Sequence, residues 1–125
     1  MTTSIEPGLY IVATPIGNLG DLSERAIATL RSATTVAAED TRTSGMLVKR
    51  AGGSGRMLSL TEHNVGQRIP ALLEAARTGI VALVSDAGTP VIADPGARLV
   101  EAAHAGGLRV VPIPGPSALA AAVSA

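Results

Sequence analysis

The sequence predicts an α/β fold: a three-layer open sheet of about five parallel strands with helices on both faces. Short apolar, β-branched runs alternate with segments of helical periodicity, which is typical of parallel strands joined by crossover helices. Within the runs apolar residues follow one another directly, as expected for strands that helices cover on both faces. The runs are LYIVAT (9–14), TTVAAE (34–39), MLSLT (57–61), IVALVS (80–85) and LRVVPI (108–113).

A first helix is expected after the first strand and its loop. Asp21 and Glu24 have the spacing of a capping box, in which two side chains satisfy backbone N–H groups at a helix start. The apolar residues around them recur at helical spacing and form one face for packing on the sheet. That face consists of Leu22, Ala26, Ile27 and Leu30.

A second helix is predicted before the fourth strand, ending at Gly79. Its apolar residues recur three and four positions apart and therefore share one face. They are Ile69, Leu72, Leu73 and Ala76.

A third helix is predicted to begin with Asp94 as its N-cap and Pro95 at its first helical position. Two glycines, Gly106 and Gly107, mark its end. The residues expected to be buried are Leu99, Val100 and Ala103.

The last twelve residues, PGPSALAAAVSA (114–125), read as a further helix with Pro116 and Ser117 in its first turn. The chain stops inside this apolar segment without a C-cap signal. We therefore expect residues 1–125 to be the N-terminal domain of a longer protein, whose C-terminal domain is absent from this chain.

Composition limits the function classes. There is no apolar run near 18 residues, no signal-peptide pattern and no cysteine, so we expect a cytoplasmic protein without a membrane segment or disulfide. Ten basic and ten acidic residues give a net charge of zero, and Tyr10 is the single aromatic residue. These counts provide little attraction for nucleic acid, so a nucleic-acid substrate would have to be gripped by another part of the protein or by a partner subunit.

Ligands of open parallel sheets bind outside the carboxyl ends of the strands. The segments that follow the predicted strands there are rich in acidic residues, and Arg42 is their only permanent cation. The chain has neither GxxxxGK nor GxGxxG, which disfavours the nucleotides that those loops bind. A cationic or zwitterionic small ligand therefore fits this edge better.

Each candidate residue also has a structural interpretation. Asp94 suits a plain N-cap, and Asp40 and Asp86 suit capping or turn positions. His63, at a strand end, is a better functional candidate than His104, which is expected on a solvated helix face; neither has the neighbours that a metal site needs. The glycines of AGGSG are interpreted as a flexible loop; they are Gly52, Gly53 and Gly55.

Five segments in order resemble the successive motifs of the tetrapyrrole methylase superfamily. Within it they are most similar to the branch that methylates the ribose 2′-hydroxyl of a cytidine in 16S ribosomal RNA. The resemblance runs from about residue 8 to the end of the chain. The segments are LYIVATPIGNLGDLSERA, AAEDTRTSGMLV, EHN, ALVSDAGTPVIADPGARLV and VVPIPGPSALAAAVSA.

The resemblance implies that S-adenosylmethionine is enclosed between this domain and a C-terminal domain, in a protein that is usually a homodimer and acts on the small ribosomal subunit. Thr89 stands where many tetrapyrrole members have Asp, which favours RNA over a corrin or porphyrin. Val65 follows Asn64 where this branch commonly has Glu, which weakens a role for an acid there. The donor-binding residues that the resemblance implies are Pro15, Asp86, Ala87, Gly88, Thr89, Pro90, Ile92, Asp94, Pro116, Ser117 and Ala118.

Methyl transfer to a ribose hydroxyl needs no metal, but it does need an aligned donor and a group that accepts the hydroxyl proton. Asp40, Asp86 and His63 are the candidates for that base, and the sequence does not choose among them. Two alternatives stay open. One is a superfamily enzyme with a corrin, porphyrin or protein substrate, and the other is a non-catalytic domain for donor binding or dimerisation.

Overall fold

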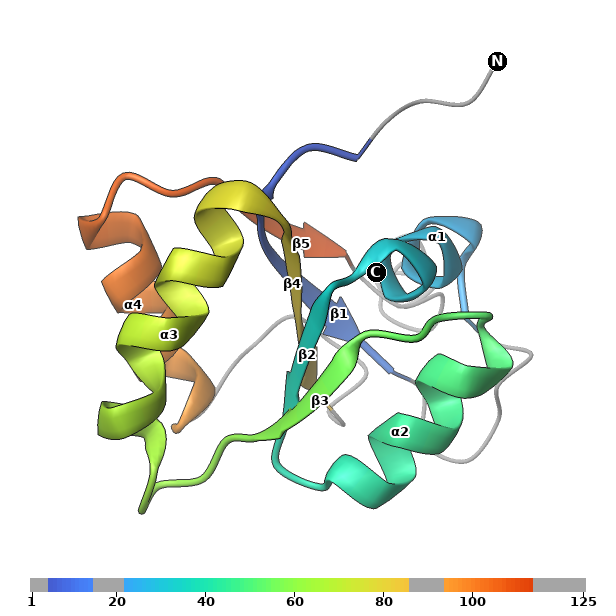
Figure 1. Cartoon of the computed structure of the whole chain (residues 1–125), viewed down its shortest axis with the longest axis horizontal. Helices are drawn as coiled ribbons and strands as arrows, with labels where there is room; N and C mark the ends of the chain where they lie inside the picture. The colour runs from blue at the N-terminus through green and yellow to red at the C-terminus, as the bar shows by residue number, and fades with distance from the viewer. Residues whose placement is uncertain (1–4, 15–21, 86–93, 114–125) are drawn as a thin grey trace, which may run out of the picture.

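The computed structural model describes residues 5–14, 22–85 and 94–113. Its centre is one parallel sheet with the strand order β3-β2-β4-β1-β5, drawn in Figure 1. The strands are β1 (Gly8–Ala13), β2 (Thr35–Ala38), β3 (Arg56–Ser59), β4 (Ile80–Ser85) and β5 (Val110–Ile113). The five predicted strands are confirmed, with boundaries within two residues of those expected.

The first strand lies inside the sheet. β1 pairs with β4 from Gly8 opposite Ile80 to Ala13 opposite Ser85, and on its other side with β5. All six residues of β1 are buried. β3 and β5 form the two edges of the sheet, and β5 carries Pro112, a residue that an edge strand tolerates because it cannot donate a ladder hydrogen bond.

Helices cover both faces of the sheet. In Figure 1, α3 and α4 lie on one side of the strands and α1 and α2 on the other, which confirms the predicted three layers. The helices are α1 (Glu24–Ser32), α2 (Thr41–Arg50), α3 (Val65–Thr78) and α4 (Gly96–Ala105). None of the helices in the described ranges is both long and apolar enough to cross a membrane.

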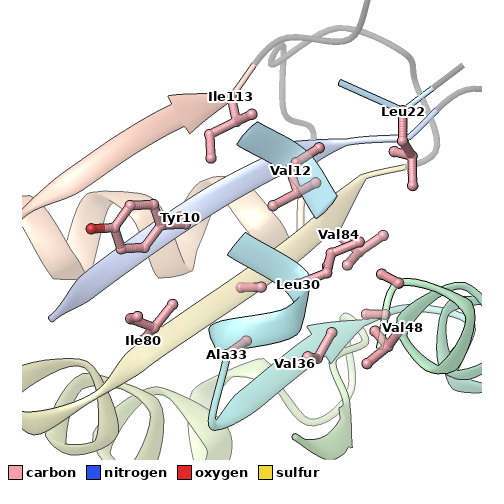
Figure 2. Close-up of a cluster of buried hydrophobic side chains, with 14 residues drawn as sticks. Tyr10, Val12, Leu22, Leu30, Ala33, Val36, Val48, Ile80, Val84 and Ile113 are labelled. Atoms are coloured by element: carbon pink, nitrogen blue, oxygen red, sulfur yellow. The ribbon is translucent and has the colours of Figure 1, made fainter. Parts of the chain in front are cut away.

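Alternate residues of each strand supply two separate cores. Tyr10 and Val12 face α1 and α2 and pack in the cluster of Figure 2, which also contains Leu30 and Val48. Leu9 and Ile11 point to the opposite face and pack with Leu72 and Leu99 of α3 and α4, among other residues. Because side chains alternate along a strand, one sheet divides the apolar residues between two layers of helices.

The start of α1 differs from the prediction. The helix begins at Glu24, and the Ser23 hydroxyl accepts a hydrogen bond from the Ala26 backbone N–H at 3.1 Å. Ser23 is therefore the N-cap, and the predicted capping box of Asp21 and Glu24 is wrong. The predicted apolar face is confirmed in Ala26 and Leu30, which are buried, while Ile27 is partly buried against the same cluster.

The start of α4 also differs. The helix begins at Gly96 with Pro95 in the N-cap position and no side-chain cap, so Asp94 stands one residue too early to be the N-cap. The predicted ends and faces are confirmed: Gly79 caps α3 and Gly106 caps α4. Leu99 and Ala103 are buried, and Val100 packs partly buried against the same core.

The glycine loop between α2 and β3 packs closely on the end of α1. A Cβ at Gly53 would lie 2.4 Å from the Leu30 carbonyl oxygen, and one at Gly55 would lie 2.4 Å from that of Ala33. Gly52 has a φ of +89°, which L residues with side chains rarely adopt. Gly53 and Gly55 are required by the close approach of two backbones and Gly52 by its positive φ, reasons that the sequence did not reveal.

Candidate functional site

The carboxyl ends of the strands gather the described candidate residues at one edge of the sheet. Glu39 and Asp40 follow β2, and the segment Thr61–Asn64 follows β3 next to it. The Leu60 N–H donates to the Ala38 carbonyl at 2.9 Å and holds these two strand ends together. Polar groups from separate parts of the sequence therefore meet at this edge, as predicted.

Asp40 is the N-cap of α2, one of the two roles that the sequence left open. One carboxylate oxygen accepts from the N–H groups of Arg42 (3.0 Å) and Thr43 (3.2 Å), and the other accepts from the Thr43 hydroxyl (3.0 Å). The backbone hydrogen bond from Thr43, followed by that from its side chain, lowers the pKa of Asp40 below its ordinary value. A carboxylate that accepts these bonds is a weaker base, so the geometry favours the capping role.

The turn between β3 and α3 is fixed by Asn64. Its side-chain oxygen accepts from the Thr61 N–H at 2.7 Å, and its amide nitrogen donates to the Ser59 carbonyl at 3.1 Å. These bonds leave the neighbouring His63 exposed, together with Glu62, at the carboxyl edge. His63 can therefore reach a ligand there, whereas His104 is exposed on α4, as predicted.

Val65 occupies the position where the resemblance leads to an acid. Its side chain is 1% exposed and packs in the core beneath α3 and α4. A buried carboxylate would need a partner to offset its desolvation, and valine needs none. At this position, where the chain departs from the family pattern, Val65 therefore serves to pack the core.

Asp94 is the donor-site candidate that lies within the described residues. The residue is exposed directly before α4, and no hydrogen bond or ion pair joins its side chain to the other described residues. Because the helix does not use it as a cap, its carboxylate is free to meet a ligand. The remaining candidates lie outside the described residues: Pro15, Asp86, Ala87, Gly88, Thr89, Pro90, Ile92, Pro116, Ser117 and Ala118.

The edge carries more cationic side chains than the sequence analysis predicted. Arg25, Arg68 and Arg98 join Arg42 there, because each lies among the first four residues of its helix and those helices start at the carboxyl ends of the strands. The prediction that Arg42 is the only permanent cation of the edge is therefore wrong. The missed signal was the position of each arginine relative to its helix start.

A cavity of about 610 Å³ lies between α1 and the strands β1 and β5, and Arg25 is among the residues that line it. Tyr10 contributes to its wall, and its hydroxyl donates to the Glu6 carbonyl at 2.5 Å. Burial raises the pKa of Tyr10, an effect that the nearby Arg109 guanidinium opposes. None of the predicted site residues that the structure describes lines this cavity.

The charges of the methyl donor can be compared with the side chains in the described part of the edge. S-Adenosylmethionine carries a sulfonium cation and an ammonium group, which exposed carboxylates suit. Asp94, Glu39 and Glu62 are exposed carboxylates at this edge. The described residues fit such a ligand, and within the described ranges no three His, Asp or Glu side chains gather into a metal site.

Comparison with known proteins identifies the family. The family model described as "Tetrapyrrole (Corrin/Porphyrin) Methylases" matches residues 8–125. A protein named "Ribosomal RNA small subunit methyltransferase I" from Mesorhizobium japonicum is 55% identical over 122 residues, covering 97% of this chain and 42% of its own length. The protein of the same name from Escherichia coli O157:H7 is 49% identical over 118 residues, covering 94% of this chain and 41% of its own length.

A solved structure supports the fold independently. The uroporphyrin-III-C-methyltransferase from Thermus thermophilus superposes with a TM-score of 0.64 at 22% identity, covering 89% of this chain and 48% of its own. The chain thus spans less than half the length of these relatives. The family-model match, which extends over most of the chain and agrees with the parallel sheet found here, shows that the chain belongs to the tetrapyrrole methylase family.

Proposed function

We propose that the whole protein is an S-adenosylmethionine-dependent methyltransferase that methylates the ribose 2′-hydroxyl of a cytidine in 16S ribosomal RNA. The observation that carries the proposal is the free, exposed Asp94 carboxylate at the carboxyl edge of the sheet. The names of the relatives support a ribosomal RNA substrate. The cytidine and the 2′-oxygen come from the resemblance of the motifs.

When bound, S-adenosylmethionine supplies an activated methyl group for in-line transfer. This chain's contribution is to bind and orient the donor, because alignment provides much of the rate enhancement in such a displacement. Asp94 would attract the positive charges of the donor, and the donor loop around Gly88, which lies outside the described residues, would surround it. The resemblance places Pro116, Ser117 and Ala118 in the same pocket.

The ribose hydroxyl must also lose a proton. Of the three candidate bases, Asp40 already accepts hydrogen bonds at both carboxylate oxygens, and Asp86 lies outside the described residues. His63 is exposed at the carboxyl edge, and histidine is the side chain that most often serves as a general base. We propose His63 as the base.

The proposal extends to assembly and location. The resemblance leads to a homodimer in the cytoplasm, with a second domain that closes the donor site in the whole protein. Light scattering after size-exclusion chromatography of the whole protein would show a mass of two chains, and a monomer would contradict this part.

The test is calorimetric titration of S-adenosylhomocysteine into the whole protein and its variants. Gly88→Val should abolish binding, because the resemblance places glycine where the donor approaches the backbone. Asp94→Asn should weaken binding about tenfold, since it keeps the shape but removes the charge that attracts the ammonium group, the positive charge that S-adenosylhomocysteine retains. Glu101→Gln, at an exposed position of α4, is the matched control and should leave affinity unchanged. Wild-type affinity in Gly88→Val and Asp94→Asn would overturn the site.

A further inference from the structure

Every helix in the described part of the chain has an arginine among its first four residues. Arg25 is the second residue of α1 and Arg42 the second of α2. Arg68 is the fourth residue of α3, and Arg98 is the third of α4. We call these four residues the arginine rim.

The positions of the rim oppose the usual preference of a helix for charge. Backbone N–H groups make a helix start electropositive, so acidic residues are favoured there and basic residues at the end. The helix ends follow that preference, with Arg31, Lys49, Arg50 and Arg77 in last turns. The arginine rim does not, so helix stability does not account for it.

Local ion pairs do not account for the rim either. The ion pairs between described residues are Arg77 with Glu74 and Arg109 with Glu6, and neither includes a rim arginine. Arg25, Arg42 and Arg98 are exposed, and the side chain of Arg25 also lines the cavity beside Tyr10. Arg68 donates from Nε to the Ser59 carbonyl at 3.2 Å, which leaves its two terminal nitrogens for another acceptor.

The topology brings the rim to one edge of the molecule. All strands are parallel, so each helix starts at their carboxyl ends; α1 and α2 do so on one face and α3 and α4 on the other (Figure 1). A Cβ on Gly66 would lie 3.6 Å from Arg98 Nη2, so the guanidinium of α4 reaches the first turn of α3, close in sequence to Arg68. Neighbouring strands lie about 4.8 Å apart, so the carboxyl edge of the sheet extends roughly 19 Å from β3 to β5.

The same edge also carries acidic residues, so the rim is not a uniformly basic surface. Asp40 caps α2 with both oxygens, and Asp94 belongs to the proposed donor site. The other described acids at the edge are Glu24, Glu39 and Glu62. Such a surface attracts phosphates at the guanidinium groups and repels them at the carboxylates that lie between these groups. It therefore suits a ligand whose negative charges are spaced along a chain.

We propose that Arg25, Arg42, Arg68 and Arg98 bind phosphates of the RNA substrate around the donor site. The inference rests on the proposed function and deepens it. Guanidinium groups on four helices and two faces cannot converge on one small anion, whereas a polynucleotide has a phosphate at every residue. Tyr10, the only aromatic residue, is buried, so backbone contacts rather than base stacking provide the affinity. The net charge of zero had led to the opposite expectation, because it says nothing of where the charges lie.

The test compares two variants of the whole protein that each lose four positive charges. In the first, Arg25, Arg42, Arg68 and Arg98 are replaced by Gln. In the matched control, Lys49, Arg50, Arg56 and Arg77 are replaced by Gln; these residues are exposed and lie toward the amino ends of the strands. Binding to fluorescently labelled 16S ribosomal RNA is measured by anisotropy over a series of salt concentrations.

The rim variant should bind at least tenfold more weakly than the wild type. Its plot of log Kd against log salt concentration should lose about 3 from its slope, the value for four released contacts to single-stranded phosphates. The control should change affinity less than threefold. The rim variant should melt close to the wild type, because relief of the charges that oppose the helix dipoles offsets the lost hydrogen bond from Arg68 to the Ser59 carbonyl.

The inference is overturned if both variants lose RNA affinity equally, if the rim variant loses none, or if the wild type does not bind RNA. Titration with S-adenosylhomocysteine separates this outcome from failure of the proposed function. A whole protein that binds the donor analogue but shows no dependence on the rim contradicts only the rim. A whole protein whose RNA binding depends on the rim but which does not bind the analogue contradicts the methyltransferase proposal.

Discussion

At the scale of single residues, the same residue type serves different roles according to where its helix begins. Asp40 stands directly before α2, where its carboxylate satisfies backbone N–H groups. Asp94 stands one residue further from its helix, and no partner holds its side chain among the described residues. A shift of one residue in the helix start therefore separates a structural carboxylate from one available to a ligand.

Asp40→Ala should lower the thermal midpoint at pH 7 by a few degrees, because α2 loses its N-cap. Asp40→Asn is the control and should lose much less, since asparagine caps as well as aspartate. Hydrogen bonds from Thr43 lower the pKa of Asp40 in the folded state, so its stabilisation is complete above the unfolded value of about 3.9 and is lost as pH falls through the lower folded value. Thermal melts between pH 2 and 7 should show the Ala deficit shrinking below about pH 4. A deficit that does not change with pH would contradict this origin.

At the scale of elements, the helices with a continuous apolar face were predictable and α2 was not. α3 places Leu72 and Ala76 in the core at helical spacing, and that pattern is visible in the sequence. The buried residues of α2 are Ser44 and Val48, with Met46 62% exposed, so its apolar face is weak. Its clearest signal is Asp40 followed by Thr43, a capping pattern that the sequence also allowed as a turn.

Leu72→Ala should lower the free energy of unfolding by about 2–5 kcal/mol, because it leaves a cavity between α3 and the sheet. Leu72 is 1% exposed, whereas its neighbour Leu73 is only partly buried. Leu73→Ala should therefore lower the same free energy by only ~1 kcal/mol. Urea unfolding followed by circular dichroism measures both values, and equal losses would show that the helix face is assigned incorrectly.

At the scale of the whole molecule, the fold could be predicted more fully than the site. Five apolar runs indicate five strands, but the order β3-β2-β4-β1-β5 depends on pairings between strands distant in sequence, which local patterns do not encode. The site edge was predicted from the same runs. The sequence left the role of Asp40 open between capping and catalysis, and it did not reveal the grouping of four arginines. Both depend on where each helix begins.

The chain of 125 residues should not methylate RNA on its own, because it spans 42% of the length of its relative from Mesorhizobium japonicum. Incubation with small ribosomal subunits and labelled S-adenosylmethionine measures this, with the full-length relative as the positive control. Robust ribose methylation by the chain alone would show that it contains the complete catalytic unit.

The central place of β1 has a consequence for the protein during its synthesis. β1 is the first of the described strands to leave the ribosome, yet its described neighbours are β4 and β5, the last two strands of the described sheet. At 5–20 residues per second, the roughly 70 residues between β1 and β4 take about 4–14 s to translate. Throughout that interval a strand whose six residues are all buried in the finished fold has no partner in the sheet. The nascent chain therefore presents an apolar strand with unpaired backbone groups on both sides, which is a binding site for a molecular chaperone and a starting point for aggregation when none is bound.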